Sequence, residues 1–288
     1  MTVEPMPAAF LGHGSPMNAL ERNRYTNAWR ELGARVPRPR GILAISAHWY
    51  VNLSAVTAMD CPKTIHDFYG FPDELSSLEY PAPGDRALAE EIAEIAKPTW
   101  VGLDHDSWGF DHGTWSVLAH AFPNADVPVV QLSINAQKPL EYHLELGAQL
   151  APLRQRGVLV ICSGNVVHNL RRLDFNQPAS GFDWAHRFDD AVRGQMASSP
   201  EDLVALRDHK DYADAVPTPD HFIPLLYLAG LASAGGSAAE VIVEGYVYGS
   251  QSMTCYTIDA NWPGEQASGG VAAALPDPDL VPPDDTNA

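Results

Sequence analysis

Residues 42–46 (ILAIS) and residues 158–162 (VLVIC) decide the fold class of this 288-residue chain. Apart from Ser46 both runs are apolar, without the alternation of polar residues that marks a strand with one face in water. Continuously apolar strands are typical of a sheet whose two faces are both covered by helices. The two runs therefore predict strands at the centre of a layered α/β domain.

On either side of these runs, short β-rich segments alternate with helical patterns. The predicted strands are 8–11, 41–46, 53–58, 127–134, 157–162, 240–246 and 253–258. The predicted helices are 19–33, 85–96, 114–121, 140–153, 184–196 and 220–232. This alternation indicates one layered α/β domain. The last two strands, joined around residues 248–250, resemble an antiparallel hairpin. We therefore expect a mixed central β-sheet flanked by helices.

The composition changes after Trp262. Residues 264–288 contain five acidic side chains and no basic ones, and they are rich in Gly, Ala, Pro and Asp. Such a segment has little apolar surface to bury, which favours disorder. We therefore expect one domain over residues 1–262 and a flexible acidic tail over residues 263–288.

The charge and the apolar pattern exclude several classes of partner. The chain has 18 Lys and Arg against 36 Asp and Glu, a formal net charge of −18. Such a surface repels nucleic-acid phosphates and anionic lipids. The most apolar stretch, residues 222–234, is too short to span a bilayer. With no signal-peptide pattern and three scattered cysteines, we expect a reduced cytoplasmic setting, with neither nucleic acid nor membrane as a partner.

Three of the eleven histidines come two to six residues after predicted strands. His13, His48 and His168 each come after an apolar run, at the strand end where α/β folds place their sites. Because strand ends converge in space, we expect these three side chains to meet. His221 follows a Pro-Asp pair that predicts a helix start, so we expect it in the first turn of helix 220–232.

The spacing of these four histidines favours a site assembled by the fold. They are too far apart for a zinc finger or an HExxH helix. Neutral imidazole binds Fe, Zn, Cu and Ni, so the histidines do not by themselves choose a metal. Any one of them, taken alone, fits a core or loop histidine equally well. The three equivalent strand ends are what favour a site.

Two loops add candidate binding residues. Residues 64–72 (TIHDFYGFP) combine His66 and Tyr69 with two phenylalanines, a composition that could cover an aromatic substrate and contact its polar groups. The alternative is a packed surface loop. In residues 109–118 (GFDHGTWSVL), His112 comes just before a predicted helix and could donate to a substrate or oxygen atom. Helix capping is the alternative for that segment.

Six motifs, in chain order, resemble the class III extradiol ring-cleavage dioxygenases, and within them the DOPA 4,5-dioxygenase-like subgroup. The motifs are LGHGSPMNAL (11–20), ISAHWY (45–50), TIHDFYGFP (64–72), DHGTWSVL (111–118), SGNVVHNLR (163–171) and PTPDHFIPLLY (217–227). The resemblance covers about residues 6–260. It implies a non-haem Fe(II) enzyme that uses O2 to open a catechol-type ring next to its two hydroxyls. Zinc can be found in the same place in crystals of similar proteins.

By position, the resemblance implies His13, His48 and His221 as metal ligands. His168 resembles the family's acid/base histidine, and it is close enough to the metal to serve as a fourth ligand. His112 resembles a second active-site histidine that contacts substrate or oxygen. The implied reaction is extradiol (meta) cleavage of a DOPA-like catechol at the 4,5 bond. His66 and Tyr69 would then hold the substrate's carboxylate or side chain.

One departure from the family pattern keeps alternatives open. The better-studied branch has a glutamate as third ligand where this sequence has His221. Glu244 is a fallback carboxylate, although its strand position argues against it. An all-histidine site also suits zinc. The alternatives are therefore a zinc-dependent hydrolase on the same scaffold and a non-catalytic metal-binding protein. The sequence leaves the oligomeric state open.

Overall fold

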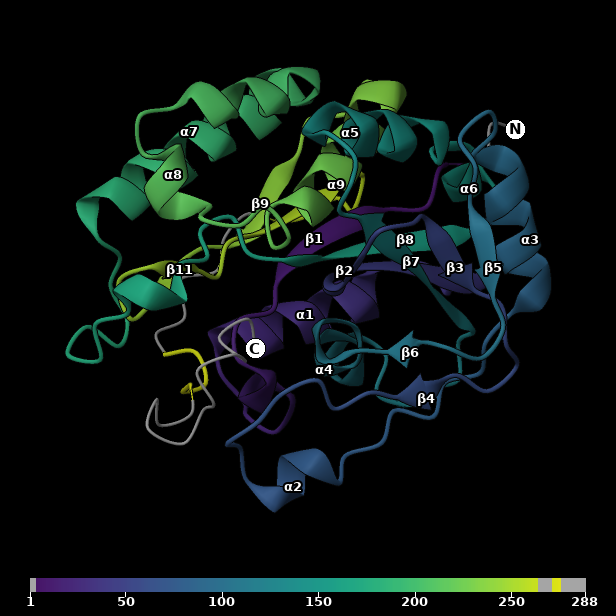
Figure 1. The fold of residues 1–288 in the computed structure, drawn as a ribbon, viewed down its shortest axis with the longest axis horizontal. Helices are drawn as coiled ribbons and strands as arrows, with labels where there is room; N and C mark the ends of the chain where they lie inside the picture. The colour runs from purple at the N-terminus through teal and green to yellow at the C-terminus, as the bar shows by residue number, and fades with distance from the viewer. Residues whose placement is uncertain (1–3, 264–270, 276–288) are drawn as a thin grey trace.

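The computed structural model describes residues 4–263 and 271–275. One eight-stranded sheet crosses the molecule in the order β5-β3-β7-β2-β8-β1-β12-β9 (Figure 1). Its strands are β1 (Ala8–Gly12), β2 (Gly41–Val51), β3 (Ala55–Thr57), β5 (Gly102–Asp104), β7 (Val129–Asn135), β8 (Val158–Gly164), β9 (Glu240–Val243) and β12 (Cys255–Ile258). Two small pairs lie outside it: β4 (Lys63–Thr64) with β6 (Gly109–Phe110), and β10 (Tyr246–Val247) with β11 (Gln251–Ser252).

The centre of the sheet is parallel and its flanks are mixed. Strand β1 pairs with β8, β8 with β2, and β2 with β7, all in parallel. Strand β12 is antiparallel to β1, and β9 is antiparallel to β12. Every residue of β1, β7 and β8 is buried, as continuously apolar runs require. The predicted mixed α/β sheet is confirmed, including the antiparallel pairing of the last two strands.

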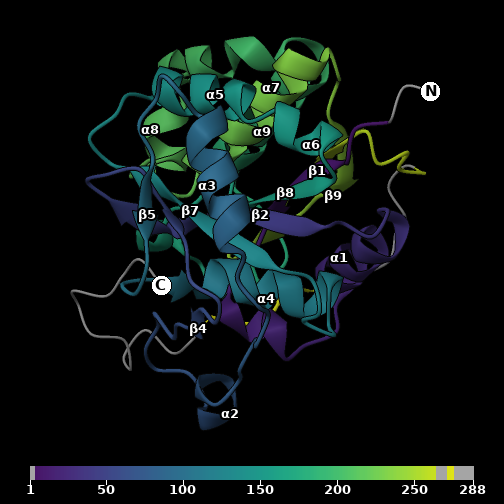
Figure 2. The same ribbon diagram turned by 90° about the vertical axis from the view of Figure 1, so that its right-hand side faces the viewer.

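Helices cover both faces of the sheet. Helices α5, α7 and α9 lie on one face and α1 and α4 on the other (Figures 1 and 2). Neighbouring residues of β2 therefore serve opposite cores, Ile42 on the α1–α4 side and Leu43 on the α9 side. No helix in the described ranges is both long and apolar enough to cross a bilayer. The helices are α1 (Arg24–Arg35), α2 (Asp73–Ser76), α3 (Arg86–Ile95), α4 (His112–Ala121), α5 (Leu140–Gln149), α6 (Pro152–Gln155), α7 (Asp183–Ser198), α8 (Tyr212–Ala215) and α9 (Ile223–Gly235), with 3-10 turns at η1 (Pro16–Ala19), η2 (Leu170–Arg172) and η3 (Pro200–Asp208).

Two helices begin later than the sequence predicts. Helix α1 starts at Arg24, because the Asn23 side chain caps it in a reciprocal capping box. Helix α9 starts at Ile223, after a turn in which Pro219 O accepts hydrogen bonds from two backbone N–H groups. His221 therefore lies two residues before the helix begins, and the prediction that it lies in the first turn is wrong.

Strand β2 is longer than predicted, and its irregular part carries a histidine. The strand runs to Val51, and its register against β7 shifts between Ile45, opposite Leu132, and Tyr50, opposite Ile134. Residues 46–49 thus form a bulge. Bulges beside active sites re-aim side chains. His48 lies inside this bulge, not beyond the end of the strand as the sequence predicts.

Part of the segment predicted as a flexible tail lies against the domain. Ala273 N donates to the side-chain oxygen of Asn18 (3.1 Å), and Ser15 Oγ donates to Ala274 O (2.8 Å). Ala273 is 1% exposed. The rest of the tail prediction, residues 264–270 and 276–288, lies outside the described residues.

Candidate metal centre

The histidines singled out from the sequence come from five elements and meet beside the carboxyl ends of β1 and β8. His13 directly follows β1, and His168 lies four residues beyond the end of β8. His48 projects from the bulge of β2, and His112 is the first residue of α4. His221 lies in the turn before α9. Residues more than 200 positions apart in the chain thus meet in one cluster, as the topology of parallel strands allows.

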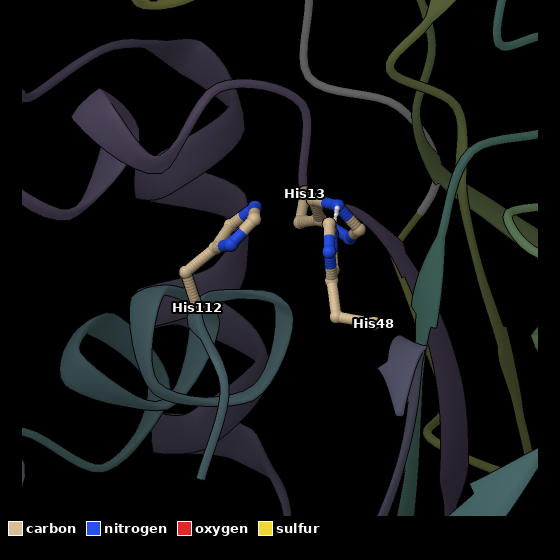
Figure 3. Close-up of side chains that lie close together, drawn as sticks. All are labelled: His13, His48 and His112. Carbon is tan, nitrogen blue, oxygen red and sulfur yellow. Dashed lines mark hydrogen bonds between the residues drawn. The ribbon is translucent and has the colours of Figure 1, made fainter. Parts of the chain in front are cut away.

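The five rings pack against one another. The His13 ring centroid lies 5.1 Å from that of His48, 5.6 Å from His112 and 5.4 Å from His221. The His48 and His112 centroids are 3.8 Å apart, and His168 stacks on His221 at 3.6 Å. His13, His48 and His112 offer ring nitrogens that all lie within 4.8 Å of one another. Figure 3 shows these three rings directed at one shared space.

Hydrogen bonding around Ser163 fixes the tautomer of His13. Ser163 Oγ donates to Gly113 O (2.5 Å) and therefore accepts from His13 Nδ1–H (2.9 Å). The His13 Nε2 lone pair is left for the cluster. Gly113 permits this close approach of α4, because a Cβ there would lie 2.9 Å from His48 Cδ2.

Two carboxylates lie beside the outer nitrogens of three other rings. Asp67 Oδ2 lies 3.2 Å from His48 Nδ1, and Asp67 Oδ1 lies 3.0 Å from His112 Nδ1. The Oδ1 atom also accepts a hydrogen bond from the backbone N–H of His112 (2.9 Å). Asp220 Oδ2 lies 2.5 Å from His221 Nδ1. Carboxylates in this position hold a ring so that Nε2 faces a metal.

Burial and mutual proximity favour the neutral form of His13, His48 and His168. Burial, followed by the neighbouring His48, holds the pKa of His13 well below its usual range. The pKa of His48 is lowered by burial and by His112, and that of His168 by burial and by His221. Burial opposes ionisation of Asp67, but the rings of His112 and His48 outweigh it and hold the pKa of that carboxyl below its usual range. Neutral imidazoles beside ionised carboxylates are what metal binding requires.

The inner nitrogen atoms of the cluster fit a divalent transition metal. His13 Nε2 and His48 Nε2 lie 3.1 Å apart. Two imidazole nitrogens that share a tetrahedral ion at about 2.0–2.1 Å lie roughly 3.3 Å apart. His112 Nε2 and His221 Nε2 are buried and have no hydrogen-bond partner among the described residues. Lone pairs gathered without donors between them are stabilised by a cation, and an all-imidazole set suits Fe, Zn, Cu or Ni.

Comparison with known proteins identifies the family. Residues 7–257 match the model of a family described as the catalytic LigB subunit of aromatic ring-opening dioxygenase. The chain belongs to this family. The resemblance drawn from the six sequence motifs is confirmed, and so is the predicted enzyme class, an aromatic ring-opening dioxygenase.

Curated relatives match this dioxygenase over most of their length. A protein of Escherichia coli (strain K12) named 4,5-DOPA dioxygenase extradiol is 47% identical over 257 residues, covering 88% of this chain and 94% of the relative. A Beta vulgaris protein of the same name is 34% identical, covering 86% and 94%. The crystal structure of an uncharacterized Escherichia coli K12 protein superposes with a TM-score of 0.78 at 42% identity, covering 88% of this chain and 99% of that one.

Of the two predicted substrate-binding residues of this dioxygenase, His66 is linked to the histidine cluster through Phe68, and Tyr69 is exposed. The His66 ring contacts Phe68 (5.8 Å between centroids), and Phe68 in turn contacts His112 (5.8 Å). His66 Nε2 lies 2.9 Å from Leu78 O, so this nitrogen is engaged with the backbone. Tyr69 is 56% exposed. One aromatic ring, that of Phe68, therefore separates His66 from the histidine cluster.

The fallback carboxylate lies elsewhere in the dioxygenase. The Glu244 carboxylate pairs with Arg193, and its side chain is 40% exposed. No contact with the five histidines is recorded for it among the described residues. The carboxylates that do reach the cluster, Asp67 and Asp220, approach the outer nitrogens of the rings.

The residues that position the dioxygenase's histidines were not assigned a role from the sequence. Asp220 adjoins His221, and this adjacency could have signalled a carboxylate–histidine pair. Ser163 directly follows an apolar strand, a placement shared with the histidines themselves. Asp67 offers no such signal, because the rings it contacts lie 19 residues before it and 45 residues after it.

Proposed function

We propose that this dioxygenase uses Fe(II) and O2 to open a DOPA-like catechol by extradiol cleavage at the 4,5 bond. The observation that carries the proposal is the cluster of buried histidines whose inner nitrogens face one another (Figure 3). The names of the Escherichia coli and Beta vulgaris relatives support the choice of DOPA as substrate. The substrate partners are therefore a catechol and O2.

His13, His48 and His221 are the proposed ligands. Each has its Nδ1 atom beside an oxygen, of Ser163, Asp67 and Asp220 respectively. When bound there, Fe(II) supplies the Lewis acidity that lowers the pKa of catechol hydroxyls and the redox chemistry that O2 needs. Zinc fits the same nitrogens, which makes the metal part of the test.

The third ligand has a competitor in His112. His221 is favoured because its Nε2 is buried without a partner and its Nδ1 is held at 2.5 Å by Asp220. His112 shares the first property and lies closer to His48. Metal content of the His221→Ala and His112→Ala proteins separates the two assignments. We expect the first variant to lose metal and the second to retain it, and the opposite result would exchange their roles.

His168 and His112 are proposed to handle protons. His168 is buried and neutral, so it can take the proton of the second catechol hydroxyl and return one later in the reaction. It could also serve as a fourth ligand, since its ring stacks on that of His221. His112 would first accept a substrate proton at Nε2 and then donate it to an oxygen that becomes negative, with the Asp67 carboxylate beside Nδ1 throughout.

The 64–72 loop is proposed to bind the substrate beyond its ring. Phe68 and Phe71 pack edge to face at 5.3 Å beside His112. Such aromatic area suits the flat face of a phenolic ring. His66 and Tyr69 lie next to these phenylalanines and would reach the carboxylate or side chain of the substrate.

Anaerobic loading of the metal-free protein with Fe(II) tests the function. We expect O2 uptake and a yellow ring-opened product when DOPA is added, with slower turnover of catechols that lack the amino-acid side chain. A Zn(II)-loaded sample is the matched control and should consume no O2. Ester or amide hydrolysis by the zinc form without any O2 uptake by the iron form would favour a hydrolase, and metal binding with neither activity would favour a non-catalytic protein.

A further inference from the structure

One carboxylate in this structure serves two of the clustered histidines at once. Asp67 places Oδ2 3.2 Å from His48 Nδ1 and Oδ1 3.0 Å from His112 Nδ1. Among the described residues, Ser163 and Asp220 each form a side-chain hydrogen bond with a single ring of the cluster. Asp67 therefore differs from the other groups that hold the outer nitrogens.

The carboxylate also joins three separate segments of the chain. His48 belongs to the bulge of β2, His112 begins α4, and Asp67 itself lies in the loop between β4 and α2. The His112 backbone N–H, one of the orphan donors of a helix N-terminus, donates to Asp67 Oδ1 at 2.9 Å. An anionic group at this position is further stabilised by the helix dipole.

The loop that carries Asp67 is fixed from both sides. Ile65 N donates to Phe110 O (2.7 Å), and Trp115 Nε1 donates to Ile65 O (2.8 Å). Phe68, the next residue after Asp67, is 5% exposed and contacts the His112 ring. Asp67 therefore stands on an anchored backbone and not on a free surface loop.

A carboxylate can only accept hydrogen bonds, and this property determines which nitrogen of each ring carries the proton. Each Nδ1 lies within 3.2 Å of an Asp67 oxygen, and the negative charge there favours a proton on Nδ1, which leaves the Nε2 lone pairs of the neutral rings directed into the cluster. We propose that Asp67 is a positioning residue that holds His48 and His112 in this tautomer and orientation together, linking the metal site to the 64–72 loop. The inference rests on the proposed function for its catalytic meaning, but the geometry and its first test concern metal binding alone.

Asp67→Asn is the sharpest substitution, because it keeps the shape of the side chain and replaces one of its two acceptor oxygens. Its amide has one oxygen and one NH2 group, so only one of the two rings can keep an acceptor at Nδ1. The other ring would face a donor and shift its proton to Nε2, turning its lone pair away from the site. Loss of such an outer partner typically weakens metal affinity or activity by about 10–100-fold.

Zinc affinity of the metal-free protein, measured by competition with a chelator, tests this without any turnover. We expect Asp67→Asn to bind Zn(II) about 10–100-fold more weakly than the parent. Asp73→Asn, an exposed carboxylate in the first turn of α2, is the matched control and should leave affinity unchanged. Unchanged affinity in a folded Asp67→Asn protein would overturn the proposal.

A double-variant comparison tests whether both rings are served. In a His112→Ala background, Asp67→Asn should still weaken zinc binding, because the contact with His48 remains to be lost. If the second substitution has no effect in that background, Asp67 acts through His112 alone and the shared role is wrong. Ring cleavage is assayed separately, so failure of the proposed activity with normal zinc results would refute the function and leave the positioning role standing.

A measurement on the unsubstituted protein covers the case in which Asp67→Asn does not fold. Nitrogen-15 NMR of the metal-free protein distinguishes the two neutral tautomers of each histidine. We expect both His48 and His112 to carry the proton on Nδ1. A proton on Nε2 of either ring would overturn the proposal.

Discussion

Two buried histidines at opposite ends of α4 show what separates a binding site from a packing contact. His120, near the end of the helix, has both ring nitrogens engaged: Nε2 lies 2.6 Å from Asn18 O, and Nδ1 lies 2.5 Å from the guanidinium of Arg30. At the start of the same helix, His112 has a carboxylate oxygen 3.0 Å from Nδ1, but neither of its ring nitrogens forms a hydrogen bond among the described residues. Both side chains are almost fully buried, at 3% and 0% exposure.

The difference lies in how the hydrogen-bonding capacity of the ring is used, and burial alone does not reveal it. A ring whose two nitrogens both form hydrogen bonds has no free lone pair and stabilises the fold. A ring whose Nε2 forms no hydrogen bond, placed beside similar rings, retains a lone pair that a cation can use. Several half-satisfied histidines in contact are therefore a stronger sign of function than the number of buried histidines.

The largest effect predicted by this comparison is the loss of the metal. His48→Ala should purify without metal and without detectable ring cleavage, because it removes a nitrogen from the centre of the cluster. His120→Gln is the matched control: it should keep the metal and lose about 1–3 kcal/mol of folding stability, as expected for a disturbed buried hydrogen-bond pair. Mass spectrometry measures the metal content of both variants, and thermal unfolding measures their stability. Metal loss in His120→Gln would contradict the comparison.

Within the cluster, His168→Ala separates proton transfer from metal binding. We expect kcat to fall by about 10²–10⁴-fold, the usual contribution of a general acid or base, while metal content stays near that of the parent. The rate and the metal content are measured on the same preparation. A variant that purifies without metal would make His168 a ligand first.

In the described part of the chain, His143 has a buried Nε2 without a hydrogen-bond partner, but its ring contacts are with tyrosines and not with other histidines. It sharpens the comparison through its response to pH. It lies between α5 and α9 with Nδ1 3.1 Å from Tyr227 Oη, and burial lowers its pKa to about 4. Because the folded protein favours the neutral ring, this stability is complete above about pH 6.5 and is lost as the pH falls toward 4. The difference between the ordinary pKa of histidine and that of His143 corresponds to about 3 kcal/mol of folding free energy.

The check for His143 is unfolding by denaturant at pH 7 and pH 4. Relative to the non-titrating His143→Gln protein, the parent should lose about 3 kcal/mol of unfolding free energy between these two values. Metal loading at pH 7 should be the same in both proteins. An equal pH dependence of the two stabilities would show that His143 does not titrate in this range.

The smallest expected effect concerns His66, which borders the cluster without belonging to it. His66→Ala should raise the KM for DOPA more than that for plain catechol, because only DOPA carries a charged substituent for the ring to contact. Losing one hydrogen bond to a charged group costs about 1.5–3 kcal/mol, or roughly 10–150-fold. Equal changes for both substrates would mean that His66 supports the loop through Leu78.

The sequence predicts the scaffold and the convergence of the histidines because both depend on local patterns. Apolar runs such as ILAIS and VLVIC specify buried strands, and parallel strands bring the residues that follow them, His13 and His168, to one edge. The bulge around His48 was not predictable, since it exists only in the register between β2 and β7. Likewise, the two-residue strands β4 and β6 carry no periodic signal, yet their pairing leads the chain to Asp67.

Strand β1 places a constraint on the order in which the site can be assembled. Ala8 pairs with Val160 on one side and with Ile258 on the other, about 150 and 250 residues further along the chain. At about 5–20 residues per second, β12 is synthesised on the order of tens of seconds after β1, and pairings over such separations form slowly. His13, the first of the five histidines to be synthesised, is therefore held in place only when the chain is nearly complete. Metal capture by the full cluster is then a post-translational event, and a nascent chain that ends before β12 would carry all five histidines without a formed site.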